Sequence, residues 1–285
     1  MLRSWLSLAV LALVVVALTA WLFHYRTPPE APQSYALSTL KAAEVKHIRL
    51  EPSAGAPVEL EREGDAWRIT SPFAARADAA RVERLLAILD ARSIARLPSS
   101  DLARYDLDRP LARVTLGGQT FAYGALNQAT REQYVLTNDA VYAVPLSQRI
   151  AVPRDADALI ARSLFAPGET PVRFDLEQFT AALEGGVWAF VPSPGDLTPD
   201  ERNAWADGWR NATAVRAARH EGSAAGPKLT VHLKDGRTIE LAVLAREPEL
   251  VLLRADQGIR YHFLPEVAKR LMSPPAGAAG DTSQK

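Results

Sequence analysis

Short segments of this chain alternate apolar and polar side chains with a period of two, which is the pattern of half-buried strands. Residues 58–62 alternate in this way, and residues 114–121 and 231–239 do so on both sides of a turn that contains glycine. Glycine between two such runs favours a hairpin. The sequence therefore predicts a protein in which hairpins are the main building blocks.

Two other segments show helical spacing. Val82, Leu85 and Leu89 fall on one face of a helix that Asp78 can cap at its N-terminus. Residues 198–201 read Thr-Pro-Asp-Glu, which supplies a threonine N-cap, proline at the first helical position and glutamate at the third. We expect one helix after each of these signals.

The chain also repeats itself. Trp67 and Trp188 each follow a glycine turn and precede a proline, and they lie 121 positions apart. Tyr142 and Tyr261 occupy matching places in a later hairpin, 119 positions apart. Several matches in the same order and at a nearly constant offset indicate an internal duplication.

These patterns predict an α+β fold, with an N-terminal transmembrane helix followed by two related, mainly antiparallel sheet-plus-helix units. The expected parts are a membrane anchor at residues 1–26, a proline-rich spacer at 27–44, a first repeat at 45–165, a second repeat at 166–272 and a disordered tail at 273–285. A short helix is expected at the junction, within residues 156–165. The residues that mark the repeat are Trp67, Trp188, Tyr105, Pro110, Tyr142 and Tyr261.

The anchor is predicted from residues 5–23, which carry no charge. Such a run nearly spans a hydrocarbon core of roughly 30 Å, and Trp5 and Trp21 lie near its ends, where indoles favour the interface. Arg3 precedes the run, which favours a cytoplasmic N-terminus. These features predict a single-pass protein of a bacterial inner membrane, held there by residues 5–23, with its C-terminal part periplasmic or otherwise extracytoplasmic.

Two alternatives to a retained anchor stay open. The run could be a cleaved signal peptide, for which residues 18–20 are the nearest cleavage-like triplet, although Leu18 is large where a small residue is preferred. It could also be a buried core helix, although no face of it is polar.

Composition narrows the function classes. The chain has 33 basic and 33 acidic side chains in 285 residues, and this neutral balance argues against a nucleic-acid-binding protein. It has no cysteine, which excludes disulfides, thiol catalysis and cysteine-ligated zinc. The sequence does not indicate an oligomeric state.

Several motifs of the first repeat are similar to a known family. Residues 105–110, which read Tyr-Asp-Leu-Asp-Arg-Pro, are the most specific; they are joined by the Trp67 strand, Pro72, the helix from Asp78 and the hairpin that contains Tyr142. Over residues 46–165 the chain resembles a bacterial family known as domain of unknown function 4340, and the second repeat resembles it more loosely. Asp106 stands where that family more often has a small residue such as glycine, and aspartate tolerates the backbone conformations of such a turn better than most residues.

The resemblance implies a membrane-anchored extracytoplasmic protein, since family members look like this. It also implies a gene neighbourhood, because many members are encoded beside components of ABC-type export or gliding-motility-like transport systems. Permease or ATPase subunits of such a system are the partners that it suggests. The family has no established catalytic residues to carry over to this chain.

The common catalytic signatures are missing from the sequence. It has no phosphate-binding loop, no dinucleotide-binding glycine motif, no nucleophile elbow and no zinc-protease helix motif. We therefore predict no catalytic residue, no cofactor and no metal. His232 and His262 lie in expected strands and could face each other as metal ligands, with Asp235 or Asp256 as a third ligand, but ordinary strand histidines are the favoured interpretation.

Two further groups of residues have both a structural and a functional interpretation. Trp205 and Trp209 could form a ligand or partner surface, with Trp209 the one suspected of exposure, whereas the recurrence of tryptophan in both repeats favours core packing. Arginines around the first helix are expected to form a solvated face; they are Arg76, Arg81, Arg84, Arg92 and Arg96.

The preferred functional hypothesis is a non-enzymatic, membrane-anchored extracytoplasmic protein that serves as an accessory or scaffolding component of an ABC-type envelope transport complex. The alternative is a stand-alone extracytoplasmic module that binds a cell-wall glycan or peptide. An uncharacterised hydrolase is a third hypothesis, and it would need a polar cluster that only the fold could bring together.

Overall fold

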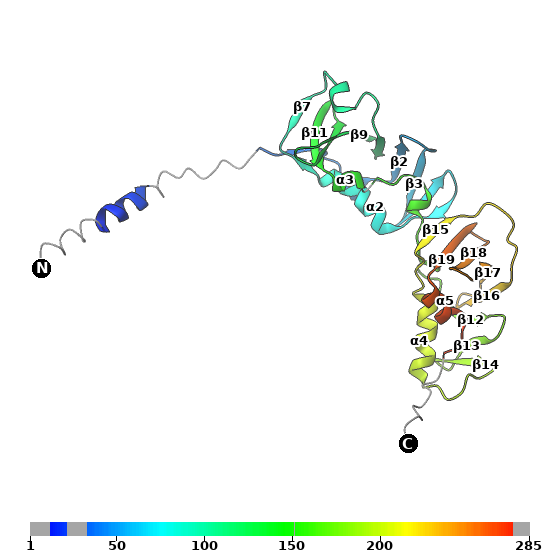
Figure 1. Cartoon of the computed structure of the whole chain (residues 1–285). Coiled ribbons are helices and arrows are strands. Elements are labelled where there is room, and N and C mark those ends of the chain that lie inside the picture. The colour runs from blue at the N-terminus through cyan, green and yellow to red at the C-terminus, as the bar shows by residue number, and fades with distance from the viewer. Residues whose placement is uncertain (1–11, 22–32, 151, 276–285) are drawn as a thin grey trace, which may run out of the picture.

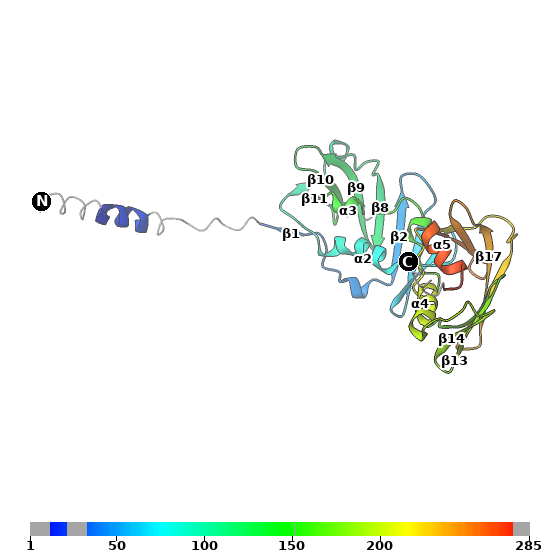
Figure 2. The same cartoon turned by 60° about the horizontal axis from the view of Figure 1, so that its bottom comes forward.

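Two antiparallel sheets, each packed against helices, make up most of this protein (Figure 1). The computed structural model describes residues 12–21, 33–150 and 152–275. The first sheet has nine strands and the second has eight, and a separate two-stranded sheet joins β1 (Tyr35–Ala36) to β6 (Arg92–Ser93). The two large sheets are set at an angle to each other in both views (Figures 1 and 2).

The first sheet has the strand order β5-β4-β3-β2-β8-β9-β10-β11-β7. Its strands are β2 (His47–Pro52), β3 (Val58–Glu63), β4 (Ala66–Ser71), β5 (Ala75–Arg76), β7 (Arg96–Pro98), β8 (Ala112–Leu116), β9 (Gln119–Asn127), β10 (Glu132–Thr137) and β11 (Ala140–Pro145). Its helical segments are η1 (Ala42–Glu44), α2 (Ala79–Leu86), η2 (Ala87–Asp90), η3 (Ala103–Tyr105) and α3 (Ser147–Ile150).

The second sheet has the strand order β14-β13-β12-β16-β17-β18-β19-β15. Its strands are β12 (Pro171–Asp175), β13 (Thr180–Glu184), β14 (Val187–Val191), β15 (Arg216–Arg219), β16 (Lys228–Leu233), β17 (Thr238–Ala245), β18 (Leu250–Arg254) and β19 (Ile259–Phe263). Its helices are α4 (Pro199–Arg210) and α5 (Pro265–Met272), which lie side by side (Figures 1 and 2), and η4 (Asp157–Leu159) precedes it in the chain.

The two sheets share one topology. In each, a three-stranded meander is followed by a helix and by a short strand at the far edge, and a four-stranded meander then fills the space between them. Trp67 lies in β4 and Trp188 in the equivalent β14, while Tyr142 and Tyr261 lie in the equivalent β11 and β19. All four rings are buried, because each strand directs alternate residues toward the helix-covered face.

Local signals place the helix starts as predicted. The Asp78 carboxylate accepts a hydrogen bond from the backbone N–H of Arg81 at the start of α2. At the start of α4, Thr198 and Glu201 form the predicted reciprocal capping box, with proline in the first turn. The short helix expected within residues 156–165 is reduced to the single turn of η4.

The predicted transmembrane helix is corrected by the structure. The described residues at this end, 12–21, are helical. None of the helices within residues 12–21, 33–150 and 152–275 has the length and apolar character that crossing a membrane requires. The predicted fold class, with its N-terminal transmembrane helix, and the predicted single-pass inner-membrane localisation are therefore wrong as stated.

Parts of the predicted anchor, spacer and tail lie outside the described residues, namely 1–11, 22–32 and 276–285. The remaining spacer residues pack on the first sheet: β1 pairs with β6, Leu37 is fully buried, and the Gln119 side chain donates to the Leu37 carbonyl at 3.0 Å. These contacts make residues 35–44 part of the first unit in the structure.

Candidate functional site

The connection between the two sheets, residues 155–169, is held on both sides and forms the candidate functional site, which we call the junction. On one side Ala77 and Ile160 form a β-bridge, and the backbone N–H of Asp78 donates to the Leu159 carbonyl at 2.7 Å. On the other side Ser163 and Thr213 form a second bridge. The connection therefore forms one isolated β-bridge with each unit.

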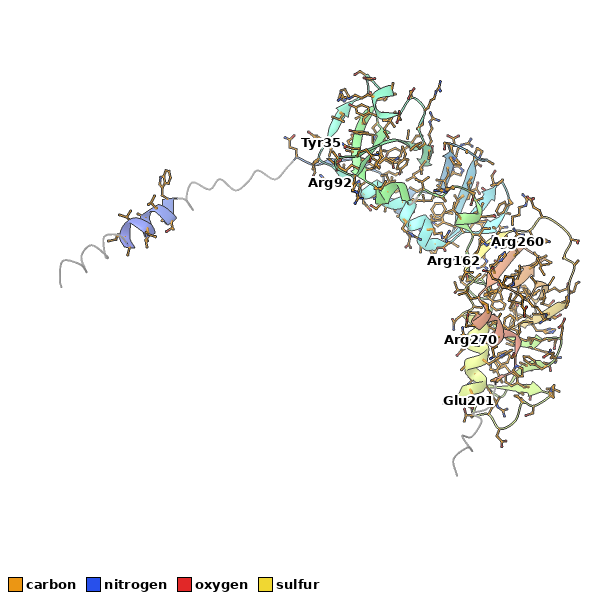
Figure 3. The ribbon with its side chains drawn as sticks, viewed as in Figure 1. Tyr35, Arg92, Arg162, Glu201, Arg260 and Arg270 are labelled. Atoms are coloured by element: carbon orange, nitrogen blue, oxygen red, sulfur yellow. The ribbon has the colours of Figure 1, made fainter. Side chains whose placement is uncertain are left out.

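Arg76 reaches from the edge strand β5 of the first sheet into the second unit. Its guanidinium donates to the Ser163 carbonyl at 2.6 Å and to the Phe165 carbonyl at 3.2 Å. It also donates to the Tyr261 hydroxyl at 3.4 Å, which in turn donates to Gln257. Tyr261 is almost fully buried, so one side chain of the first unit ends inside the second (Figure 3 shows the neighbouring Arg162 and Arg260).

Arg254 forms the charged centre of the junction. This side chain is only 1% exposed and donates to the Glu169 carboxylate at 2.7 Å, to Asp256 at 2.7 Å and to the Leu164 carbonyl at 3.0 Å. Burial by itself would lower the pKa of Arg254, but the hydrogen bonds to Glu169 and Asp256 outweigh it and raise that pKa. Arg254 is therefore a fixed cation that ties the connection to β18.

Glu169 is the buried partner of this cation. Burial alone would raise the pKa of Glu169, but the hydrogen bond from Arg254 and another from the Ala166 backbone N–H hold it below its ordinary value. Removing one partner of a buried ion pair strongly destabilises a protein, because the other charge is left buried and unpaired. The junction is thus sensitive to single substitutions.

Sequence reasoning missed these residues. The arginines near the first helix were expected to form a solvated face, whereas Arg76 and Arg81 both donate to backbone carbonyls of the junction. A usable signal did exist at Arg254, since a charge at the end of the apolar run Val251-Leu252-Leu253 indicates a buried charge with a partner.

The structure places Trp205 and Trp209 in an aromatic core. Trp209 is fully buried and Trp205 is 3% exposed, so the exposure suspected for Trp209 is wrong. Both rings pack around Phe174, with centroid distances of 5.3 and 5.1 Å, and Trp188 joins them at 5.5 Å. Their indole N–H groups donate to the Ser273 and Leu271 carbonyls, which fixes the end of α5 against α4.

A groove of about 470 Å³ runs between α4 and α5. Trp205 contributes only its small exposed edge, and Glu201, Lys269, Arg270 and Pro274 form much of the remaining wall. Figure 3 places Glu201 and Arg270 along this side of the second unit. Trp205 and Trp209 thus belong to a buried aromatic cluster beneath a groove that has both apolar and charged residues in its lining.

The histidines considered as metal ligands are kept apart. His232 on β16 and His262 on β19 are separated by β17 and β18, and each pairs with its own carboxylate. His232 contacts Asp175 at 2.8 Å, and His262 contacts Glu249 at 3.0 Å. Within the described ranges no group of three His, Cys, Asp or Glu side chains could hold a metal ion.

The pKa of His262 is lowered from its ordinary value. Burial lowers its pKa, the nearby cations Arg216 and Arg260 lower it further, and the hydrogen bond with Glu249 opposes the change without reversing it. Arg216 on β15 lies opposite His262 in the strand register, and its guanidinium contacts His262 Nδ1 at 3.1 Å.

The turn at residues 105–110 is a packing element. Tyr105 is buried and packs against Tyr134 with ring centroids 4.7 Å apart and the rings tilted by 56°, and Pro110 follows in the loop before β8. Asp106 has a φ of 52°, in the left-handed region. That conformation explains why glycine suits this position, and aspartate is among the residues that tolerate it.

A family model describes part of this chain. The model for a domain of unknown function, DUF4340, matches residues 67–220, which is more than half of the chain. The chain belongs to this family. The match does not coincide with the first repeat over which the resemblance was expected: it begins at Trp67 in β4, crosses the junction and ends at His220 just after β15. The DUF4340 unit in this protein thus includes the junction and parts of both sheets. Comparison with curated proteins and with solved structures found no match.

Proposed function

We propose that this DUF4340 protein is a non-enzymatic accessory or scaffolding component of an ABC-type transport complex. The observation that carries the scaffolding role is the junction. Arg76, Arg254 and two β-bridges join the sheets, and a single hydrophobic cluster includes residues of both. A body of this kind presents surfaces of both units to partners at a fixed spacing and angle.

The polar contacts of the candidate metal ligands support the same interpretation. His232 and His262 are each paired with a carboxylate. Asp235 caps its own hairpin by accepting from the Arg237 backbone N–H at 3.0 Å, which lowers the pKa of Asp235. Each of these groups has a structural use that accounts for its presence.

The transport part of the proposal rests on the family. The resemblance noted from the sequence implies genes for ABC-type export components beside many members, and membership in DUF4340 makes that implication relevant here. Permease or ATPase subunits are the partners proposed on this ground. The alternative, a glycan- or peptide-binding module that uses Trp205 and Trp209, loses its support because neither ring is available for stacking.

Affinity purification of the tagged full-length chain from its own cells, after mild crosslinking, tests the proposal. We expect a permease or ATPase subunit of an ABC-type system to be enriched at least tenfold over an untagged strain. The variant Arg76→Ala, which releases the junction, should lose most of this enrichment, because the two units no longer hold a fixed geometry.

Arg68→Ala is the matched control, since Arg68 pairs with Arg76 in the sheet register but its side chain is exposed. It should retain the wild-type enrichment. Recovery of the chain without any transport subunit would contradict the transport role, and equal enrichment for Arg76→Ala would contradict the role of the junction.

A further inference from the structure

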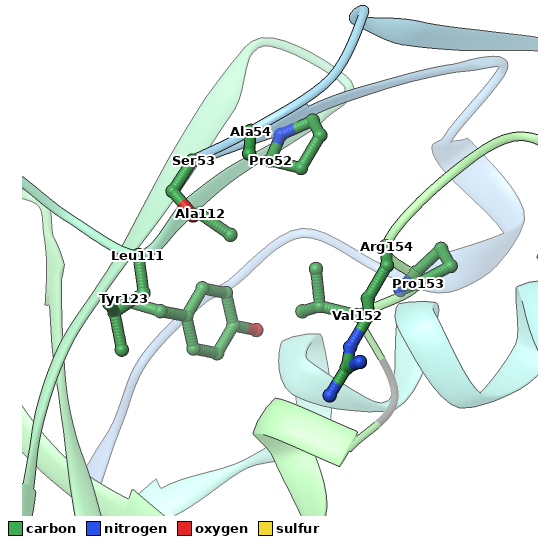
Figure 4. Close-up of a pocket in the computed structure, with 9 residues that line it drawn as sticks. All are labelled: Pro52, Ser53, Ala54, Leu111, Ala112, Tyr123, Val152, Pro153 and Arg154. Atoms are coloured by element: carbon green, nitrogen blue, oxygen red, sulfur yellow. The ribbon is translucent and has the colours of Figure 1, made fainter.

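A cavity of about 560 Å³ opens in the first unit, away from the junction contacts described above (Figure 4). It lies between the loop after β2, the start of β8 and the connection that follows α3. The apolar part of its wall comes from Pro52, Leu111, Val152 and Pro153, and Ser53, Tyr123 and Arg154 contribute polar groups. This volume is within the range of small-molecule and short-peptide sites.

Tyr123 on β9 supplies a buried polar group to this cavity. Its side chain is almost completely buried, with 2% of the residue exposed, and Figure 4 shows its hydroxyl directed into the open space. No hydrogen bond joins that hydroxyl to any residue in the described ranges. Burial raises the pKa of Tyr123, so the group stays a neutral phenol that can donate a proton to a hydrogen bond.

Arg154 supplies a charge at the same cavity. Its side chain is exposed and forms no ion pair with the described residues, and in Figure 4 it extends along Val152 on the side opposite Pro52. A guanidinium can only donate hydrogen bonds, and its planar geometry matches the two oxygens of a carboxylate. No acidic side chain is among the described residues that line the cavity.

We propose that this cavity binds a carboxylate carried on a small apolar group, with the Arg154 guanidinium and the Tyr123 hydroxyl donating to its oxygens and Leu111, Val152 and Pro52 contacting its apolar part. The cavity offers two hydrogen-bond donors, and no acidic side chain is among the described residues that line it, so it favours an anion that accepts hydrogen bonds. One positive charge matches a carboxylate, and the apolar side chains of Pro52, Leu111 and Val152 can contact a small hydrophobic group attached to it. The proposal does not depend on the transport role.

Such a carboxylate has two sources, a free organic acid or the C-terminus of a peptide. Calorimetric titration of the full chain with hexanoate, and with trialanine bearing a free C-terminus, separates them. Hexanamide and amidated trialanine are the matched neutral probes. We expect at least one free carboxylate to bind at least tenfold more tightly than its amide; tight binding of hexanoate alone points to an organic acid, and tight binding of trialanine to a peptide end.

Tyr123→Phe and Arg154→Gln should each lower the affinity for the carboxylate about tenfold. This ratio corresponds to the loss of one charge-assisted hydrogen bond. Arg113→Gln, an exposed arginine on the neighbouring β8 that does not line the cavity, should bind as wild type does. Arg154 is exposed, so its variant keeps the test valid even if Tyr123→Phe folds poorly. Equal affinity for acid and amide, or unchanged affinity in Arg154→Gln, would overturn the proposal.

Discussion

Replacement of Arg254 by methionine is expected to lower the free energy of unfolding by about 3–5 kcal/mol, the usual cost of leaving one member of a buried ion pair alone. Glu169 is only 7% exposed on its side chain, so its carboxylate would stay buried without its main cation. The Leu164 carbonyl would lose a donor as well. Urea unfolding, followed by tryptophan fluorescence from the aromatic core, measures the change.

Arg237→Met is the matched control, because Arg237 approaches the same Glu169 carboxylate at 3.8 Å but is 61% exposed. It should cost less than about 1 kcal/mol, as exposed ion pairs do. The double variant Arg254→Met with Glu169→Gln should recover part of the loss, because it removes the stranded charge. A loss below 1 kcal/mol for Arg254→Met would show that the pair does not hold the junction.

The ion pair also makes the stability of the folded chain depend on pH in the acid range. The pKa of Glu169 is lowered in the folded chain from its ordinary 4.5, so the folded state binds this proton less readily than the unfolded state. The stabilisation that this group contributes is therefore complete above pH 4.5 and is lost as the pH falls through the lowered value.

Gly124→Ala is the second substitution with a large expected effect, a loss of about 1–3 kcal/mol from overpacking. A Cβ atom at Gly124 would lie 2.2 Å from the Tyr105 carbonyl oxygen and 2.8 Å from Leu107 Cγ. Backbone atoms of β9 or of the 105–110 turn would have to move. The Gly124 carbonyl also accepts a hydrogen bond from the buried Gln133 side chain at 2.8 Å, which resists that movement.

The same substitution at Gly208 should change the stability in the opposite direction. Gly208 lies within α4, and a Cβ there would meet nothing closer than 3.9 Å. Alanine favours a helix over glycine by about 1 kcal/mol, so Gly208→Ala should stabilise the chain slightly. Thermal unfolding of the two variants measures both. Equal melting temperatures for Gly124→Ala and wild type would contradict the close packing of the turn on β9.

Features that depend on neighbouring residues could be predicted from the sequence. The caps at Asp78 and Thr198 involve partners three positions away, and hairpin turns need only a glycine between two alternating runs. Such local preferences are decided before the chain packs. The left-handed Asp106 belongs to the same class, because its conformation is a property of one turn.

Features that join distant residues could not be predicted in this way. Arg76 and the Phe165 carbonyl are 89 positions apart, and Arg254 and Glu169 are 85 apart. Alternating patterns identify which residues are buried but not what they meet across the fold. Tyr123 has the pattern of an ordinary core residue in β9, and only the arrangement of β8 and the connection after α3 opens a cavity at its hydroxyl. The hydrophobic run at the N-terminus also satisfied a composition rule for a transmembrane helix that the described helix does not meet.

Differential scanning calorimetry of the full chain tests most directly whether the two sheets form one body. We expect a single transition in which the calorimetric and van't Hoff enthalpies agree, because breaking the junction exposes the core shared by both units. Two separable transitions in the wild-type chain, with one sheet unfolding while the other stays folded, would show that the junction does not join the sheets into one body.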